Sequence, residues 1–335
     1  MKLSTIVTLA VGGFATGAAG ALVPPAGTIP YSFYSLAFQD QLVKNTAAIK
    51  GKPYAHFFDP QLFVYPEMID PGRLEIDCPT QAMKPDLSDI NTLNVPATTT
   101  LPVENGWCVY KDGSAYVASR THFPGGTGEM AQWWMWWHSA ESARYTLWHP
   151  WAHVSVSSTF ADKFNDTTLN STAKLYGSLH SITEIIQEVS EKIDIKWYDP
   201  SHFGLDTSKF EANGIVANAC GEIYFGNGSP IKAINMVHLW YKTSTGLDLR
   251  SRYYIANDIK LDIPFLGFIP LNTLANTFGI KKLLVGRKMA ELQFHHDQQE
   301  FTHLASFLPD IYREFGPAGG DLSERSSGRH DNSEL

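Results

Sequence analysis

The sequence predicts an α+β fold in which a curled antiparallel sheet surrounds one long C-terminal helix, the helix-grip or START-like arrangement. Segments with alternating apolar and polar residues follow one another from about residue 154 to residue 255. Helical spacing of apolar residues then extends from about Lys281 to Phe315. A smaller N-terminal region, residues 22–126, is expected to wrap around this domain, which we place at residues 127–315.

Composition narrows the class of protein. Of the 335 residues, 44% are hydrophobic and 18% are charged, and the formal net charge is −8. These values are typical of a soluble globular protein of one large domain or two modest ones. The acidic balance argues against nucleic-acid binding, which needs a basic face. No stretch reaches the roughly 20 apolar residues of a membrane-spanning helix, so we also expect no membrane partner for the mature chain.

Residues 1–21 are typical of a secretory signal peptide. Lys2 supplies the charged start, Ile6–Phe14 the short apolar core, and small residues precede a cleavage point near Ala21. Three N-glycosylation triplets also indicate a secreted glycoprotein, and they begin at Asn165, Asn170 and Asn227.

The chain has three cysteines, Cys78, Cys108 and Cys220. An oxidising compartment would allow one disulfide and leave one thiol over. Cys78 and Cys108 are the nearest pair in sequence, but spacing alone does not fix the geometry, so the pairing stays open. No CxxC spacing is present, and we assign the cysteines no catalytic role.

The N-terminal region is expected to hold a short helix around Ala37–Ala48 and then an extended segment, residues 57–103, rich in Pro, Asp and Thr. Residues Gly106–Ser119 form a predicted hairpin with a Lys-Asp-Gly turn. Pro124, Gly125 and Gly126 end this region.

Six of the nine tryptophans fall within Met130–His153. We predict one helix here, with Thr127 as N-cap and no Gly or Pro until Pro150. At about 3.6 residues per turn, Trp134, His138, Glu141 and Tyr145 would share one face and form an aromatic wall with one imidazole. In the alternative interpretation the tryptophans are ordinary core and His138 is a satisfied buried histidine.

The strands of the second domain are predicted from alternation. On Leu179–Ile186 the alternation places His180, Ile182 and Glu184 on one face. A Pro- and Gly-bearing connection covers 263–278, and the polar tail, residues 316–335, is expected to be disordered. The predicted strands are 154–158, Leu179–Ile186, Ile193–Tyr198, Ile215–Phe225, Ile234–Tyr241 and Leu247–Ile255.

His296 and Glu300 stand at i and i+4 on the predicted terminal helix, a spacing that suits chelation of a divalent metal. An ordinary pair on a helix surface is the alternative interpretation. His138 and Glu184 strengthen the metal hypothesis, since each is hard to bury without a partner. Two His and two Glu would suit zinc and leave room for a water molecule.

Four stretches resemble the diacetylphloroglucinol and phloretin hydrolase family. They are ENGWCVYKDGSAYVAS at Glu104–Ser119, FPGGTGEMAQWWMWWH at Phe123–His138, LRSRYYI at Leu249–Ile255 and HDQQE at His296–Glu300. The resemblance implies a zinc-dependent hydrolase that cleaves the carbon–carbon bond between an acyl group and a polyphenol ring. It also implies a small aromatic substrate and a homodimer formed through the N-terminal part.

Carried over position by position, the resemblance implies His138, Glu184, His296 and Glu300 as ligands of Zn²⁺, with Glu188 as an alternative to Glu184. His238 and Tyr253 match positions that contact the phenol. They are expected to act as an acid–base pair beside a zinc-activated water.

The chain departs from the family pattern in two places. Glu141 stands where the family has an amide residue, and a carboxylate there would repel a phenolate or demand a different ring substituent. The predicted signal peptide is the second departure. A non-hydrolytic helix-grip protein that binds or isomerises an aromatic natural product is the rival hypothesis. A complete set of two His and two Glu distinguishes the two, because a carrier has no reason to keep it.

Overall fold

The computed structural model describes residues 22–69, 71–186, 188–263, 265, 267–277, 281 and 285–317. The predicted signal peptide, and the predicted disordered tail from residue 318 onward, lie outside the described residues. Among the helices that the structure describes, none combines the length and the apolar character needed to cross a bilayer.

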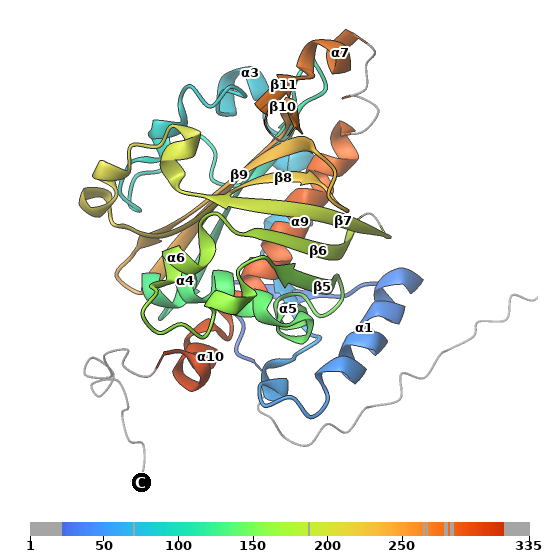
Figure 1. Cartoon of the computed structure of the whole chain (residues 1–335), viewed down its shortest axis with the longest axis vertical. Coiled ribbons are helices and arrows are strands. Elements are labelled where there is room, and N and C mark those ends of the chain that lie inside the picture. The colour runs from blue at the N-terminus through green and yellow to red at the C-terminus, as the bar shows by residue number, and fades with distance from the viewer. Residues whose placement is uncertain are drawn as a thin grey trace, which may run out of the picture.

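A large antiparallel sheet dominates the described chain and confirms the α+β class (Figure 1). A separate pair joins β1 (Ile29–Tyr31) and β2 (Leu62–Val64). Strand β11 (Gly267–Pro270) pairs with β10 outside the main strand order. That order is β3 (Gly106–Val109), β4 (Ala115–Pro124), β10 (Gly246–Ile263), β9 (Ile231–Lys242), β8 (Ile215–Phe225), β7 (Val189–Tyr198), β6 (Leu179–Ile186) and β5 (His153–Ser158).

Helices surround this sheet. The α-helices are α1 (Leu36–Ile49), α2 (Pro71–Leu74), α3 (Cys78–Gln81), α4 (Gly128–Trp137), α5 (Ser142–Trp148), α6 (Ser171–Leu175), α7 (Asn272–Thr277), α9 (Gly286–Ala305) and α10 (Leu308–Phe315). Short 3-10 helices are η1 (Ala55–Phe57), η2 (Pro66–Met68), η3 (Ile90–Leu93), η4 (His138–Ala140), η5 (Ala161–Lys163), η6 (Pro200–Phe203), η7 (Thr207–Lys209) and η8 (Glu211–Asn213).

Helix α9 runs across one face of the sheet (Figure 1). It contacts β3 and β4 near one edge and β6 near the other. Phe301 and Leu304 are buried along it, as the helical spacing predicted, and Phe294 is buried as well. A C-terminal helix against a large antiparallel sheet is therefore confirmed, while the relation to helix-grip folds stays a prediction.

The prediction of one helix from Lys281 to Phe315 is wrong, because the chain leaves helical geometry between α9 and α10. Phe307, with φ −136° and ψ −8°, precedes α10, and Pro309 lies in the first turn of that helix. Proline has no N–H to continue an earlier helix and fits the first turn of a new one.

The prediction of one helix over the tryptophan segment is also wrong. Helix α4 ends at Trp137 and passes through η4 to Glu141, which is extended at φ −156° and ψ 134°. The hydroxyl of Ser142 bonds the backbone N–H and C=O of Val156 in β5, so α5 is fixed to the neighbouring strand. Such side-chain bonds to the backbone compete with helix continuation.

The sheet separates two hydrophobic cores, because successive side chains point to opposite faces of a strand. On β10, Ser251 and Tyr253 face the core that contains α9, whereas Tyr254 belongs to the core beneath the N-terminal wrap. The second core includes Ile90 and Leu93 of η3. The later part of the predicted wrapping segment therefore covers the face of the sheet away from α9, whereas Val64 and Met68 in its first part pack into the core with α9.

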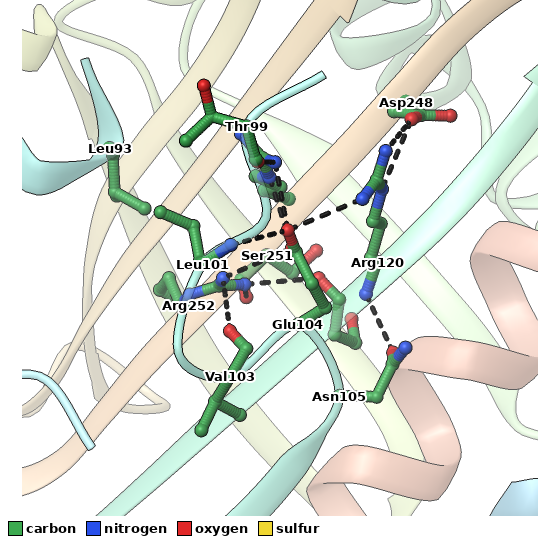
Figure 2. A network of polar contacts seen from close by, with 12 residues as sticks. Leu93, Thr99, Leu101, Val103, Glu104, Asn105, Arg120, Asp248, Ser251 and Arg252 are labelled. Atoms are coloured by element: carbon green, nitrogen blue, oxygen red, sulfur yellow. Dashed lines mark hydrogen bonds and ion pairs between the residues drawn. The ribbon is translucent and has the colours of Figure 1, made fainter. Parts of the chain in front are cut away.

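The end of the wrapping segment, before β3, is fixed to the sheet by a buried ion-pair network around Glu104 (Figure 2). Its carboxylate accepts from Arg250 Nη2 at 2.9 Å and Nε at 3.1 Å, and lies 3.8 Å from Arg252 Nη2. Both arginines are fully buried. Arg252 also donates to the carbonyl of Val103 at 3.0 Å, and Arg250 to that of Thr99 at 2.6 Å. Glu104 thus neutralises two guanidinium groups that the sheet could not bury alone.

Near this network a disulfide joins Cys78 of α3 to Cys108 of β3, and Cys220 is a buried free thiol. The bridge resolves the pairing that the sequence left open. It ties the wrap to the predicted hairpin, which the structure confirms as β3 and β4.

We predict that Glu104→Gln lowers the free energy of unfolding by about 3–5 kcal/mol, because it leaves buried arginines without a charge partner. Chemical denaturation of both proteins measures the difference. Glu75→Gln is the matched control, since Glu75 pairs with the exposed Arg287 at 2.6 Å and such pairs contribute about 0–1 kcal/mol. Equal losses in the two variants would contradict a central role for Glu104.

We also predict that the double variant Cys78→Ser/Cys108→Ser loses about 3–4 kcal/mol of stability, because the bridge closes a loop with a sequence separation of 30. Added dithiothreitol should lower the wild-type midpoint in urea toward that of the double variant and leave the variant unchanged. A wild-type midpoint insensitive to the reductant would contradict this expectation.

Candidate active site

Two imidazoles and two carboxylates meet between the sheet and α9. Strands β5 and β6 pair so that His153 lies opposite Glu184, and α9 brings His296 and Glu300 on one face. The Nε2 atom of His153 lies 3.3 Å from Glu300 Oε2 and 3.7 Å from Glu184 Oε2. The Nε2 atom of His296 lies 3.4 Å from Glu184 Oε2 and 3.9 Å from Glu300 Oε2. All four residues are buried.

The hydrogen bonds of this cluster leave ligand atoms free. His153 Nδ1 donates to the carbonyl of Tyr145 at 3.0 Å, so its Nε2 carries the lone pair. Both His153 Nε2 and His296 Nε2 are buried without a hydrogen-bond partner. Metal-binding histidines show this pattern, with one ring nitrogen fixed by a second group and the other facing the ion.

Tyr145 supports two of these groups from α5. Its ring stacks on His153 with centroids 3.8 Å apart, and its hydroxyl donates to Glu184 Oε2 at 2.9 Å. Behind His296, the ring of His149 stacks at 5.1 Å and donates from Nε2 to Gln299 Oε1 at 3.1 Å. Such outer contacts orient metal ligands.

Electrostatics also favour a cation at this position. Burial, and then the neighbouring carboxylates of Asp297 and Glu184, raise the pKa of Glu300 well above its usual range. Burial also lowers the pKa of His153 well below its usual range, so this imidazole is neutral and cannot compensate the carboxylates. Within the described chain, His153, His296 and Glu300 offer ligand atoms that lie within 4.8 Å of one another. Two carboxylates and two imidazoles fit a divalent ion such as zinc.

The structure brings together three of the four predicted ligands, Glu184, His296 and Glu300. Glu188, the predicted alternative to Glu184, is exposed in the turn after β6 and has φ 64°. His138 lies outside the group, at the end of α4, where its Nδ1 donates to the carbonyl of Trp134 at 2.7 Å.

Sequence reasoning missed His153, which occupies the place expected for His138. Treating the tryptophan segment as one helix made His153 its last residue, whereas the structure starts β5 there. The missed signal was that His153 directly precedes the alternating segment 154–158.

A second polar chain reaches the same pocket from β9 and β10. Tyr253 donates to Asp297 Oδ1 at 2.6 Å, and His238 Nε2 lies 3.5 Å from the Tyr253 hydroxyl. His238 Nδ1 is 2.8 Å from the hydroxyl of Ser251, its neighbour across the two strands. Ser119 also donates to Asp297. The predicted pair of His238 and Tyr253 is thus in contact and extends to a carboxyl group that the sequence analysis did not name.

Burial sets the protonation of this chain. It lowers the pKa of His238 to about 3, so the ring is neutral. Burial raises the pKa of Asp297 to about 6, against hydrogen bonds from Ser119 and Tyr253 that lower it. Burial and the Asp297 charge raise the pKa of Tyr253 well above its usual range, so this phenol keeps its proton.

One pocket joins the metal-ligand cluster to this chain. Glu184, His296 and Glu300 line one part of it, and His238 and Tyr253 another. The remaining wall is mostly apolar and includes Met135, Trp148, Ile182, Ile195, Trp197, Ile223, Ile234 and Met236. Such a wall suits a flat organic ring.

The expected carboxylate of Glu141 does not line this pocket. The extended backbone at Glu141 turns its side chain toward the N-terminal region, where it binds Lys52 and the hydroxyl of Tyr54. The prediction that Glu141 would repel a phenolate is therefore wrong, because that prediction assumed an unbroken helix.

Comparisons with known proteins identify relatives of this chain. The family model described as DAPG hydrolase PhiG domain matches residues 83–313, which contain every residue of the cluster and of the His238 chain. A 2,4-diacetylphloroglucinol hydrolase of Pseudomonas protegens is 33% identical over 291 residues, 86% of this chain and 92% of the relative. A phloretin hydrolase of Eubacterium ramulus is 30% identical over 210 residues, 62% of this chain and 71% of the relative.

Among solved structures, one titled "Crystal structure of Ara h 8.0201" aligns with 58% of this chain and 97% of its own, at 9% identity and a TM-score of 0.30. A score this low assigns no fold.

We predict that His153→Ala loses bound zinc and that His138→Ala keeps it. His153, unlike His138, directs a free nitrogen at both carboxylates. Elemental analysis after dialysis against a weak chelator measures the metal in each folded variant. The reverse result, with zinc lost from His138→Ala alone, would restore His138 as a ligand.

Proposed function

This chain belongs to the DAPG hydrolase family, and on that premise we propose that it is a zinc-dependent hydrolase that cleaves the carbon–carbon bond between an acyl group and a polyphenol ring. An acylphloroglucinol is the expected substrate class. The observation that carries the proposal is the buried cluster of two imidazoles and two carboxylates, because Glu184, His296 and Glu300 of this cluster line a pocket whose remaining wall is mostly apolar.

The residues that would hold the zinc ion are His153, Glu184, His296 and Glu300. In this set His153 takes the place that the sequence analysis gave to His138. The reason is that the unpaired nitrogens of His153 and His296 lie near the same carboxylate oxygen of Glu184. When bound, zinc polarises a carbonyl oxygen and lowers the pKa of a bound water toward neutrality. Glu184, His296 and Glu300 line one end of the pocket and would fix the position of the acyl group there.

The proposed reaction is a hydrolysis with balanced bonds. The oxygen of one water molecule joins the acyl carbon, and the bond from the acyl carbon to the ring carbon breaks. The electron pair of that bond stays on the ring carbon, which takes a proton. A carboxylic acid and a ring with hydrogen in place of the acyl group leave. The ring carbon is a poor leaving group unless it is protonated, so a proton donor near the ring is needed.

His238 and Tyr253 are the proposed proton-handling groups. The Ser251 hydroxyl holds His238 Nδ1, so Nε2 is the nitrogen near the Tyr253 hydroxyl and the pocket. Asp297 fixes Tyr253 through a 2.6 Å bond and keeps its oxygen toward His238. Tyr253 also suits hydrogen bonding to a ring oxygen. A neutral His238 can accept a proton at its free nitrogen, and it donates one only after it has taken one up.

Secretion belongs to the same proposal. Asn165 and Asn170 are both exposed, as glycosylation requires, and Asn170 caps α6 through its side chain. The disulfide between Cys78 and Cys108 is compatible with an oxidising compartment. We propose a processed glycoprotein that starts near Ala21, with a homodimer as its assembly.

We predict about one zinc ion per chain in protein purified without chelators, as a four-ligand site holds. His296→Ala should lose both the ion and the hydrolysis of an acylphloroglucinol, because one of four ligands is gone. His238→Ala should keep its zinc and lose roughly 10²–10⁴-fold in turnover, the usual contribution of a positioned proton donor. Acid release and metal content are measured together for each variant.

The control is His56→Asn, a change at a half-exposed histidine that pairs with Glu314 on the surface. It should keep both zinc and turnover. A fully active protein without metal would overturn the zinc proposal. Zinc without acid release from any acylated polyphenol would favour the rival hypothesis of a binding or isomerising pocket protein.

A further inference from the structure

The pocket has a second polar end, away from the metal-ligand cluster. His138 at the end of α4 and His180 on β6 both line it, with ring centroids 6.2 Å apart. Both side chains are buried, at 3% and 1% exposure. Neither histidine takes part in the proposed hydrolytic chemistry.

The strand fixes the separation of the two ends. His180, Ile182 and Glu184 are the buried residues of alternate positions on β6, so they share one face. At about 3.3 Å per residue, the Cα atoms of His180 and Glu184 are about 13 Å apart. Ile182 lies between them and lines the same pocket. The two polar ends therefore lie at different positions along one face of β6, with the apolar Ile182 between them.

Each histidine has unused hydrogen-bonding capacity in this wall. Because His138 Nδ1 donates to the carbonyl of Trp134, its Nε2 is an acceptor in the neutral ring. His180 Nε2 is buried and has no hydrogen-bond partner. Buried polar atoms are normally satisfied, so an orphaned nitrogen at a pocket wall calls for a ligand.

The surroundings select a neutral ligand group. Trp134 and Trp148 pack against the His138 ring at 5.6 and 5.0 Å, and Trp197 against His180 at 5.5 Å. Burial lowers the pKa of His138 to about 4, and that of His180 well below its usual range, so neither ring carries charge near neutral pH. A charged group would lose its hydration here without a counter-charge, whereas a hydroxyl would find an acceptor.

We propose that His138 and His180 bind a ring hydroxyl remote from the acyl group that is cleaved, and so determine which polyphenols the pocket accepts. This inference rests on the proposed function, which places the acyl group at the metal end. A ring held there directs its opposite edge toward the two histidines. The substrate class is thus narrowed to acylated rings with a free hydroxyl on that far edge. Rings with no oxygen there, or with a methyl ether, leave the His138 acceptor unpaired.

Binding of acyl-free rings tests the inference without any turnover. Isothermal titration of the zinc-loaded full chain compares 1,3,5-trihydroxybenzene with 1,3-dihydroxybenzene, which lacks the third hydroxyl. The wild type should bind the trihydroxy ring at least about tenfold more tightly, because loss of the donor leaves a buried acceptor unpaired.

Two variants of His138 distinguish the contributions of its two ring nitrogens to binding. His138→Asn places an amide near the Nδ1 position and keeps the bond to Trp134, but removes the acceptor at Nε2. It should bring the affinity ratio close to one and leave the affinity for the dihydroxy ring within about twofold. His138→Gln reaches the Nε2 position and should retain part of the preference. His180→Phe keeps the ring edge against Trp197 and should also lower the ratio.

His56→Asn is the control for the amide substitution and should keep the full preference. Equal wild-type affinity for the two rings, or no binding of either ring, overturns the inference. So does a preference that survives in both His138→Asn and His180→Phe.

The proposed function fails separately. If no acid is released but the binding preference is intact, the proposed hydrolase function is contradicted. The inference that His138 and His180 bind a ring hydroxyl would then still hold. Hydrolysis without any preference for the third hydroxyl would remove only the inference on specificity.

Discussion

The burial of Glu184 and Glu300 beside the imidazoles of His153 and His296 is the constraint on which the rest of the site depends. Two carboxylates removed from water need a positive charge nearby, and burial keeps the His153 imidazole from providing it. A divalent cation meets this need and satisfies the orphaned nitrogens at the same time. This need for a positive charge supports the proposal that the cluster is a set of metal ligands.

The two faces of the sheet contact different parts of the protein around this site. One face of β10 places Ser251 and Tyr253 against α9 and the pocket, while the other places Arg250 and Arg252 against Glu104. The N-terminal wrap thus stabilises the strand from behind without entering the site. Tyr253 and His238 come from strands held on both sides, which favours a fixed geometry for proton transfer.

The break in the helix after α4 determines which histidine lies beside the two buried carboxylates. With an unbroken helix, His138, Glu141 and Tyr145 would share a face. The extended Glu141 instead sends its own side chain to Lys52 and Tyr54 and lets α5 lie along β5. Tyr145 can then support His153 and Glu184, while His138 stays in an aromatic wall. One turn of irregular backbone thus separates the metal end of the pocket from its other polar end.

The sequence pattern was enough to predict the strands from β5 to β10, the hairpin at Gly106–Ser119 and the class of the fold, because alternation and turn residues act locally. It did not predict the short strands β1, β2 and β11. It also placed Glu184, His296 and Glu300, since strand alternation and i, i+4 spacing fix which side chains share a face. Only the tertiary structure decided that His153 joins them. That choice depends on the pairing of β5 with β6 and on the Ser142 contact that ends the helical segment, and both are contacts between distant residues.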